Sequence, residues 1–211
     1  GRVHYRGRRD VFQILTDDRR RHLFCVGKTG MGKTTLLANM VGSDIKAGRG
    51  VCLIDPHGDL AESVLDMVPK RRTNDVVYFD AADTQFPIAF NPLQLPAGRD
   101  ATLVVDGVVS SFQKVFGFDE SSAPRMMHIF KNCLMALVGS SGATLISLQR
   151  ILHDAGYRKQ VLQHVENPAV LDFWHNEFGK WNDRDRTQYI ASLQNKLGAF
   201  LSNDTLQGIF G

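Results

Sequence analysis

The fold is decided by residues 27–34, G-K-T-G-M-G-K-T, which follow the apolar run L-F-C-V at residues 23–26. The run predicts a strand, and the residues from Lys33 onward predict a helix, so the glycine-rich loop stands at a strand-to-helix junction. Glycines allow successive backbone N–H groups to turn inward toward phosphate oxygens. The positive end of the following helix faces the same anion. This arrangement predicts a phosphate-binding loop.

Residues 27–35 supply the contacts that a nucleoside triphosphate and its metal ion need. Lys33 brings a positive charge to the β- and γ-phosphates, and the hydroxyl of Thr34 is placed to bind Mg²⁺. An ordinary glycine-rich turn before a helix is the alternative, and the agreement of spacing with context favours the phosphate loop. We therefore expect ATP and Mg²⁺ to bind through the following residues: Gly27, Lys28, Thr29, Gly30, Met31, Gly32, Lys33, Thr34 and Thr35.

Apolar runs alternate with amphipathic stretches on the C-terminal side of the loop. One helical stripe covers residues 33–48, and a shorter one covers residues 59–69. The continuous apolar runs at residues 51–54 and 76–79 are typical of strands that are buried on both faces of a parallel sheet. Strand, helix, strand, helix and strand in this order predict an α/β fold with right-handed crossovers.

The strand signals end at Gly98, and beyond it the pattern is helical. Apolar residues recur there at helical spacing on three stripes, which are Val104, Val108, Phe112 and Val115; Met126, Phe130, Cys133 and Leu137; and Ile190, Leu193, Leu197 and Phe200. Met126 and Met127 are interpreted as core filling. We predict that residues 1–98 are the N-terminal part of a nucleotide-binding domain, residues 99–204 an inserted all-helical domain, and residues 205–211 the return to the first domain.

Two aspartates follow apolar runs and are candidates for the metal site. Asp55 is preferred to Asp80, because ligands of an open α/β sheet lie beyond the carboxyl ends of its strands and this run directly follows the loop's helix. Asp55 is therefore predicted to join Thr34 at Mg²⁺, and Lys33, Asp55 and His57 are the catalytic candidates. The equally weighted alternative is a turn in which Asp55 and Asp59 cap backbone N–H groups. No acidic D-E pair follows a later apolar run.

Composition separates the two halves of the chain by charge. Residues 1–98 hold 14 Lys and Arg against 11 Asp and Glu, whereas residues 99–211 hold 11 against 11, so the net charge of +3 comes from the first part. Its short basic clusters can either meet nucleic acid phosphates or form solvated surface. These clusters are Arg2, Arg6, Arg8 and Arg9; Arg19, Arg20 and Arg21; and Lys70, Arg71 and Arg72. The three cysteines lie in apolar runs and are expected to be buried and reduced, as in a cytoplasmic protein.

The sequence resembles the conjugative DNA-transfer ATPases, the coupling proteins of type IV secretion and their relatives. The resemblance rests on H-L-F-C-V-G-K-T-G-M-G-K-T-T, V-C-L-I-D-P-H-G-D-L-A, D-V-V-Y-F-D-A-A-D and P-I-A-F-N-P-L, with P-R-M-M-H-I-F-K-N and N-K-L-G-A-F-L in the helical part. It implies a RecA-like hexameric motor whose nucleotide-binding domain carries an inserted all-helical domain. It also implies that the acidic motif and the arginine finger follow the insertion, beyond Gly211.

The same resemblance implies the partners and the location of the protein. The expected partners are nucleic acid, bound through the hexamer of the full-length protein, and secretion or relaxase-type proteins. The expected location is the cytoplasm, at the inner face of the membrane in members whose membrane helices precede this segment. The helical part is expected to dock proteins, although a basic face around Arg150, Arg158 and Lys159 would allow DNA contact.

Three other functions share the phosphate loop. A secretion ATPase that energises pilus assembly or protein export is the nearest alternative to a DNA or nucleoprotein translocase. A small nucleotide kinase needs a lid with arginines and an acceptor pocket, and a neutral helical region serves these poorly. A structural module that holds nucleotide without turning it over is the remaining alternative.

Overall fold

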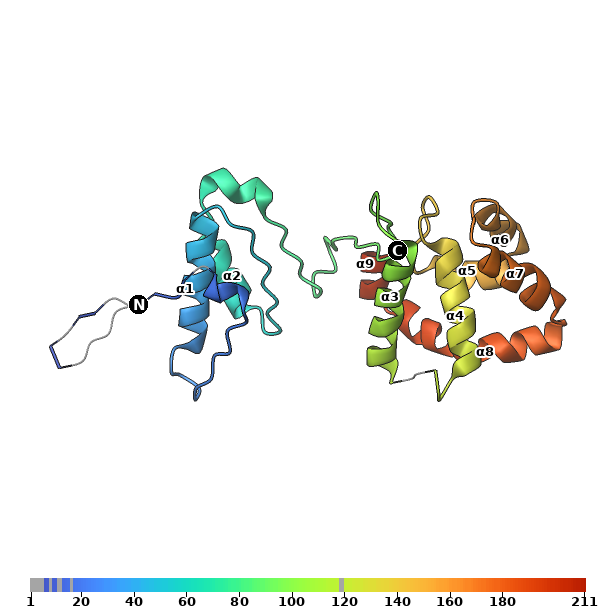
Figure 1. Ribbon diagram of the computed structural model, residues 1–211, viewed down its shortest axis with the longest axis horizontal. Coiled ribbons are helices and arrows are strands. Elements are labelled where there is room, and N and C mark those ends of the chain that lie inside the picture. Colours follow the sequence, from blue (N-terminus) through green and yellow to red (C-terminus); the bar gives the residue numbers. More distant parts are fainter. Residues whose placement is uncertain (1–5, 8, 11–12, 16, 118–119) are drawn as a thin grey trace. The chain divides into compact units, whose positions relative to one another are not determined.

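The computed structural model describes residues 6–7, 9–10, 13–15, 17–117 and 120–211 (Figure 1). Arg2 and Arg8, from the first predicted basic cluster, lie outside the described residues. The chain divides into two compact units, Gly1–Val77 and Tyr78–Gly211. The domain bounds drawn from the sequence stay a prediction.

The first unit is built around α1 (Lys33–Lys46), which packs against α2 (Asp59–Leu65). Two 3₁₀ turns, η1 (Asp18–Arg20) and η2 (Lys70–Asp75), flank this pair. The buried face of α1 consists of Ala38, Gly42 and Ile45, which helical spacing places on one stripe. A Cβ on Gly42 would lie 2.7 Å from the Met67 sulfur, so glycine permits the close approach of the chain after α2. The helix predicted from Lys33 is confirmed.

The predicted RecA-like parallel sheet is wrong for this structure, because no strand occurs among the residues that it describes. The apolar runs at residues 23–26, 51–54 and 76–79 have no regular secondary structure. Phe24, Ile54 and Val77 are 91%, 86% and 80% exposed, whereas the strands predicted at residues 51–54 and 76–79 were expected to be buried on both faces. The bonds of an α-helix join residues four apart, whereas a strand exists only when a second segment pairs with it. The α/β fold class is therefore corrected to a helical one.

The second unit contains the longer helices, and the three predicted stripes lie in α3, α4 and α8 (Figure 1). Its α-helices are α3 (Ala101–Phe116), α4 (Pro124–Leu137), α5 (Ser147–His153), α6 (Ala155–Leu162), α7 (Pro168–Asp172), α8 (Asp183–Leu201) and α9 (Asp204–Phe210). A π-helical turn, η3 (Phe173–Glu177), and a 3₁₀ turn, η4 (Phe178–Lys180), follow α7. Asp100 starts α3 by accepting a bond of 2.8 Å from the Thr102 N–H, and Gly117 ends it with φ 62°.

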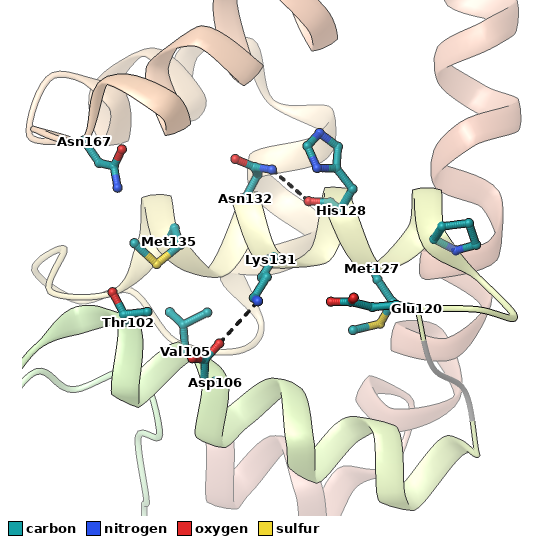
Figure 2. A pocket seen from close by; sticks show the side chains of 11 residues that line it. Thr102, Val105, Asp106, Glu120, Met127, His128, Lys131, Asn132, Met135 and Asn167 are labelled. Atoms are coloured by element: carbon teal, nitrogen blue, oxygen red, sulfur yellow. Dashed lines mark hydrogen bonds and ion pairs between the residues drawn. The ribbon is translucent and has the colours of Figure 1, made fainter.

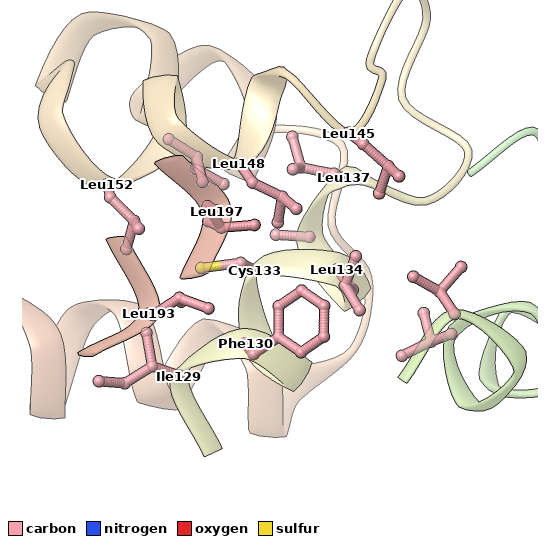
Figure 3. Close-up of a cluster of buried hydrophobic side chains, with 14 of the residues drawn as sticks. Ile129, Phe130, Cys133, Leu134, Leu137, Leu145, Leu148, Leu152, Leu193 and Leu197 are labelled. Carbon is pink, nitrogen blue, oxygen red and sulfur yellow. The ribbon is translucent and has the colours of Figure 1, made fainter. Parts of the chain in front are cut away.

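The core of this unit surrounds α4, which packs against α3, α5 and α8 (Figure 3). Phe130, Leu134 and Cys133 have no exposed surface, and burial raises the pKa of the Cys133 thiol. Met126 and Met127 are buried in the same core, so their interpretation as core filling is confirmed. Cys52 is exposed, however, which contradicts its predicted burial. Among the described helices, none combines the length and apolar character needed to cross a membrane.

Candidate nucleotide-binding site

The glycine-rich loop adopts the backbone conformation that its sequence requires. Gly30 and Gly32 have φ angles of 81° and 82°, in the left-handed region that side chains with a Cβ disfavour. A Cβ at either position would meet no atom within 4 Å, so backbone conformation and not crowding explains these two glycines. The loop is also exposed, with Met31 72% accessible. The predicted loop residues are thus brought together on an open surface at the start of α1.

The N-terminus of α1 has no side-chain cap. Gly32 precedes the helix without a side chain to bond, and the first intrahelical bond runs from the Leu36 N–H to the Gly32 carbonyl at 2.9 Å. Thr34 and Thr35 are both exposed in this first turn. An uncapped N-terminus presents N–H groups and a partial positive charge to any anion placed before it. This end of α1 therefore fits a phosphate group.

The side chain of Lys33 folds back over the loop and contacts its backbone. Its Nζ donates to the carbonyl of Gly27 at 2.7 Å and to that of Lys28 at 3.0 Å. A Cβ at Gly27 would lie 3.6 Å from the Lys33 Cγ, so the aliphatic part of the lysine passes close to the loop backbone. An ammonium group has three N–H donors, and two of them bind these carbonyls. The third is available to a phosphate oxygen while the lysine keeps its position.

The opposite end of α1 is held by two arginines from η2. Arg72 donates to the carbonyls of Ile45 and Arg49 at 2.8 Å and 3.0 Å, and Arg71 donates to the carbonyl of Lys46 at 3.2 Å. These bonds satisfy carbonyl groups at the C-terminal end of the helix, where a positive charge also opposes the negative end of the dipole. Two of the three residues in the third predicted basic cluster, Arg71 and Arg72, therefore bind this protein's own backbone.

Asp44 ties further parts of the unit to α1. Arg19 of η1 binds both of its carboxylate oxygens, and Arg49 binds one of them at 2.8 Å. The hydrogen bonds from Arg19, followed by the bond from Arg49, lower the pKa of Asp44 to about 2. Arg19 belongs to the second predicted basic cluster, so this cluster also contributes an arginine to internal structure. Asp44 was not predicted from its sequence context, although an acidic residue near the negative end of a helix favours a compensating cation nearby.

Asp55 caps α2 in this structure. Its Oδ2 accepts from the N–H groups of Leu60 and Ala61 at 2.8 Å and 3.1 Å, and its Oδ1 accepts from that of His57 at 3.2 Å. These bonds hold the pKa of Asp55 below its usual range, and the bond from the His57 N–H has the largest effect. Asp59 stands in the first turn of α2, and His57 is exposed. The capping alternative describes the geometry of Asp55, whereas no such bond to the Asp59 side chain occurs among the described residues, and the role of Asp55 at Mg²⁺ stays a prediction.

The other candidate aspartate, Asp80, lies in the second unit. It accepts a bond of 2.8 Å from the Ala82 N–H within an exposed turn. In the part of the chain that the structure describes, no group of three or more His, Cys, Asp or Glu side chains is arranged for a metal ion. Binding of Mg²⁺ at Thr34 does not require such a group, because this ion usually keeps several waters and phosphate oxygens as ligands.

The comparisons with known proteins give one positive result. The family model described as the helicase HerA central domain matches residues 14–207, which include the loop, α1 and most of the helical unit. Searches of the curated proteins and of the solved structures found no match.

Proposed function

The chain belongs to the family of the HerA helicase central domain, an ATP-binding domain of motor-type ATPases, and we propose that it serves a DNA or nucleoprotein translocase of conjugation or type IV secretion. The open loop at the uncapped start of α1, with Lys33 lying across it, supports the nucleotide-binding part of the proposal. The C-terminal end of that helix is fixed by Arg71 and Arg72, so the loop is attached to an anchored element. The role in conjugation or secretion rests on the resemblance of the sequence to the conjugative DNA-transfer ATPases.

Different groups of the loop would bind different parts of ATP and its metal ion. The N–H groups of the loop and of the first turn of α1 bind phosphate oxygens, and the free donor of Lys33 adds a charge-assisted bond. Thr34 would hold the metal through its exposed hydroxyl. Bound Mg²⁺ supplies positive charge that stabilises the phosphoryl group during its transfer.

The helical unit suits protein docking better than DNA binding. Arg158, from the predicted basic face, donates to the carbonyls of Ile151 and Leu152 at 2.8 Å and 3.2 Å and lies 4.9 Å from the ring centre of Phe178. Burial, followed by repulsion from Arg186, lowers its pKa. Its neighbour Arg150 forms an ion pair with Asp154 at 3.4 Å and stacks on Tyr157. Non-specific DNA affinity comes mainly from cations free to displace counterions, and these arginines are already bound.

Turnover of ATP by the complete protein, measured with and without DNA, tests the proposed function. We expect DNA to stimulate turnover and Lys33→Ala to abolish it. Lys46→Ala is the matched control, because it removes the same charge from the exposed opposite end of α1. Turnover that responds to secretion partners but not to DNA would favour the secretion ATPase. Nucleotide binding without any turnover would favour the structural module.

Binding of DNA at two salt concentrations tests the role of the helical unit. The double variant Arg150→Ala, Lys159→Ala of the complete protein should keep the DNA affinity and the salt dependence of the wild type. A loss of about tenfold, with a shallower salt slope, would place a DNA contact on this unit and remove the docking proposal.

A further inference from the structure

A pocket of about 540 Å³ opens in the helical unit between α3, α4 and the residue that caps α7 (Figure 2). Val105, Met127 and Met135 contribute apolar groups to its lining, although Val105 and Met127 are almost fully buried. The charged side chains of the lining, which form its rim, are Asp106 from α3, Glu120 from the segment before α4, and Lys131 from α4. Pockets that bind small groups typically enclose about 300–1,000 Å³ and combine an apolar lining with a few polar residues. The volume of this pocket lies in that range, and its lining is more polar than usual, because seven of its eleven residues are polar or charged.

The rim has an unbalanced negative charge. The Lys131 ammonium lies 3.4 Å from the Asp106 carboxylate, and both side chains are nearly half exposed, so the pair leaves the carboxylate accessible. Glu120 has no ion pair among the described residues, and Figure 2 shows its carboxylate directed toward the opening. His128 bonds at 3.0 Å to Glu177, which lies outside the pocket lining. One lysine thus faces two carboxylates.

We propose that this pocket binds an arginine side chain presented by a protein partner. The three methylenes of arginine would lie against the apolar groups of the lining, and its guanidinium would donate to the carboxylate of Glu120 or of Asp106. The excess of negative charge on the rim favours a cation over an anion at this exposed site. The inference rests on the proposed docking role of the helical unit and names the side chain that is recognised.

Titration of the ¹⁵N-labelled whole chain with the peptide acetyl-Ala-Arg-Ala-amide tests the pocket. We expect amide shifts confined to the residues around Asp106, Glu120 and Lys131. The peptide in which citrulline replaces arginine has nearly the same shape without the charge, and it should bind about two- to fivefold more weakly, the range of an exposed ion pair. Equal shifts with both peptides, or no shifts with either, would overturn the proposal.

Substitutions in the rim should change the affinity in opposite directions. Glu120→Gln should weaken arginine-peptide binding about two- to fivefold, and Lys131→Met should strengthen it to a similar degree, because Asp106 then loses its competing cation. A gain in affinity cannot arise from misfolding. Glu62→Gln is the matched control, since it removes the same charge from an exposed position of α2 in the first unit. Unchanged affinity in both rim variants would overturn the proposal.

The outcomes distinguish the pocket from the docking role on which it rests. If the docking role fails, the helical unit contributes to DNA binding in the salt titration, whatever the peptides do. If the pocket alone fails, DNA binding remains independent of the helical unit while the arginine peptide gives no localised shifts.

Discussion

The two units of this protein are stabilised by different interactions. In the first unit, the buried apolar residues among those described are Ala38, Ile45 and Val64, and arginines bonded to Asp44 and to helix carbonyls hold α1. In the second unit, an extensive apolar core surrounds α4. Burial of apolar surface dominates stability where it is available. The unit with the nucleotide loop should therefore respond to charge, and the helical unit to packing.

The largest expected reduction in the free energy of unfolding follows from removing an aromatic ring from the core. Phe130 has no exposed surface and lies 5.0 Å from the ring centre of Phe112, so Phe130→Ala should reduce the free energy of unfolding by about 3–5 kcal/mol. Phe24→Ala is the matched control in the first unit. Because Phe24 is 91% exposed, this substitution should reduce the free energy of unfolding by less than about 0.5 kcal/mol. Urea unfolding followed by helix circular dichroism measures both. Equal losses would remove the distinction between the units.

A smaller effect is expected from Asp44→Asn. The substitution leaves Arg19 and Arg49 without their carboxylate and should destabilise the first unit by about 1–2 kcal/mol, because both arginines are partly solvated. Hydrogen exchange of the α1 amides should become faster, and exchange in α4 should stay unchanged. Faster exchange in both helices would mean that the two units unfold together.

Lowering the pH should destabilise the first unit through protonation of Asp44. The pKa of Asp44 is lowered to about 2 in the folded protein, so its stabilising contribution is complete above its ordinary pKa of about 4 and is lost as the pH falls toward 2. Amide spectra recorded between pH 5 and pH 2 should lose the α1 signals first. If Asp44→Asn shows the same acid dependence as the wild type, another carboxylate is responsible.

The smallest effect concerns the two roles considered for Asp55. Removal of its bonds in Asp55→Ala should speed exchange of the Leu60 and Ala61 amides, and Asp55→Asn should do so less, because the amide keeps one acceptor oxygen. The Mg²⁺ dependence of nucleotide affinity separates the second role. If Asp55→Asn leaves that dependence unchanged, the predicted contact with Mg²⁺ is wrong and capping is its function.

Helices and the loop were predictable because their determinants are local. The stripe from Lys33 gives α1, and the stripes through Val108, Phe130 and Leu197 give α3, α4 and α8. The loop glycines were expected to adopt conformations that a Cβ disfavours, and Gly30 and Gly32 have positive φ angles whereas Gly27 does not. Each of these features depends on residues only a few positions apart.

The lack of strands among the described residues and the arginine contacts were not predictable, for the opposite reason. Four apolar residues such as those at 51–54 are compatible with a strand, but pairing depends on segments far away in the chain. The bond from Arg72 to the Ile45 carbonyl spans 27 positions and leaves no periodic signal. The basic clusters were therefore interpreted by charge alone, as surface for nucleic acid or solvent, whereas Arg19, Arg71 and Arg72 bind within the protein.

Nucleotide affinity of the whole chain tests the central claim most directly, because it depends on the loop without requiring turnover. A fluorescent ATP analogue with Mg²⁺ should bind the wild type and Lys46→Ala equally, and Lys33→Ala about tenfold or more weakly, the loss expected for a charge-assisted bond. Hydrogen exchange in the same samples should show protection by nucleotide at residues 27–35. Equal affinity of the wild type and Lys33→Ala, with no protection of the loop, would contradict the account.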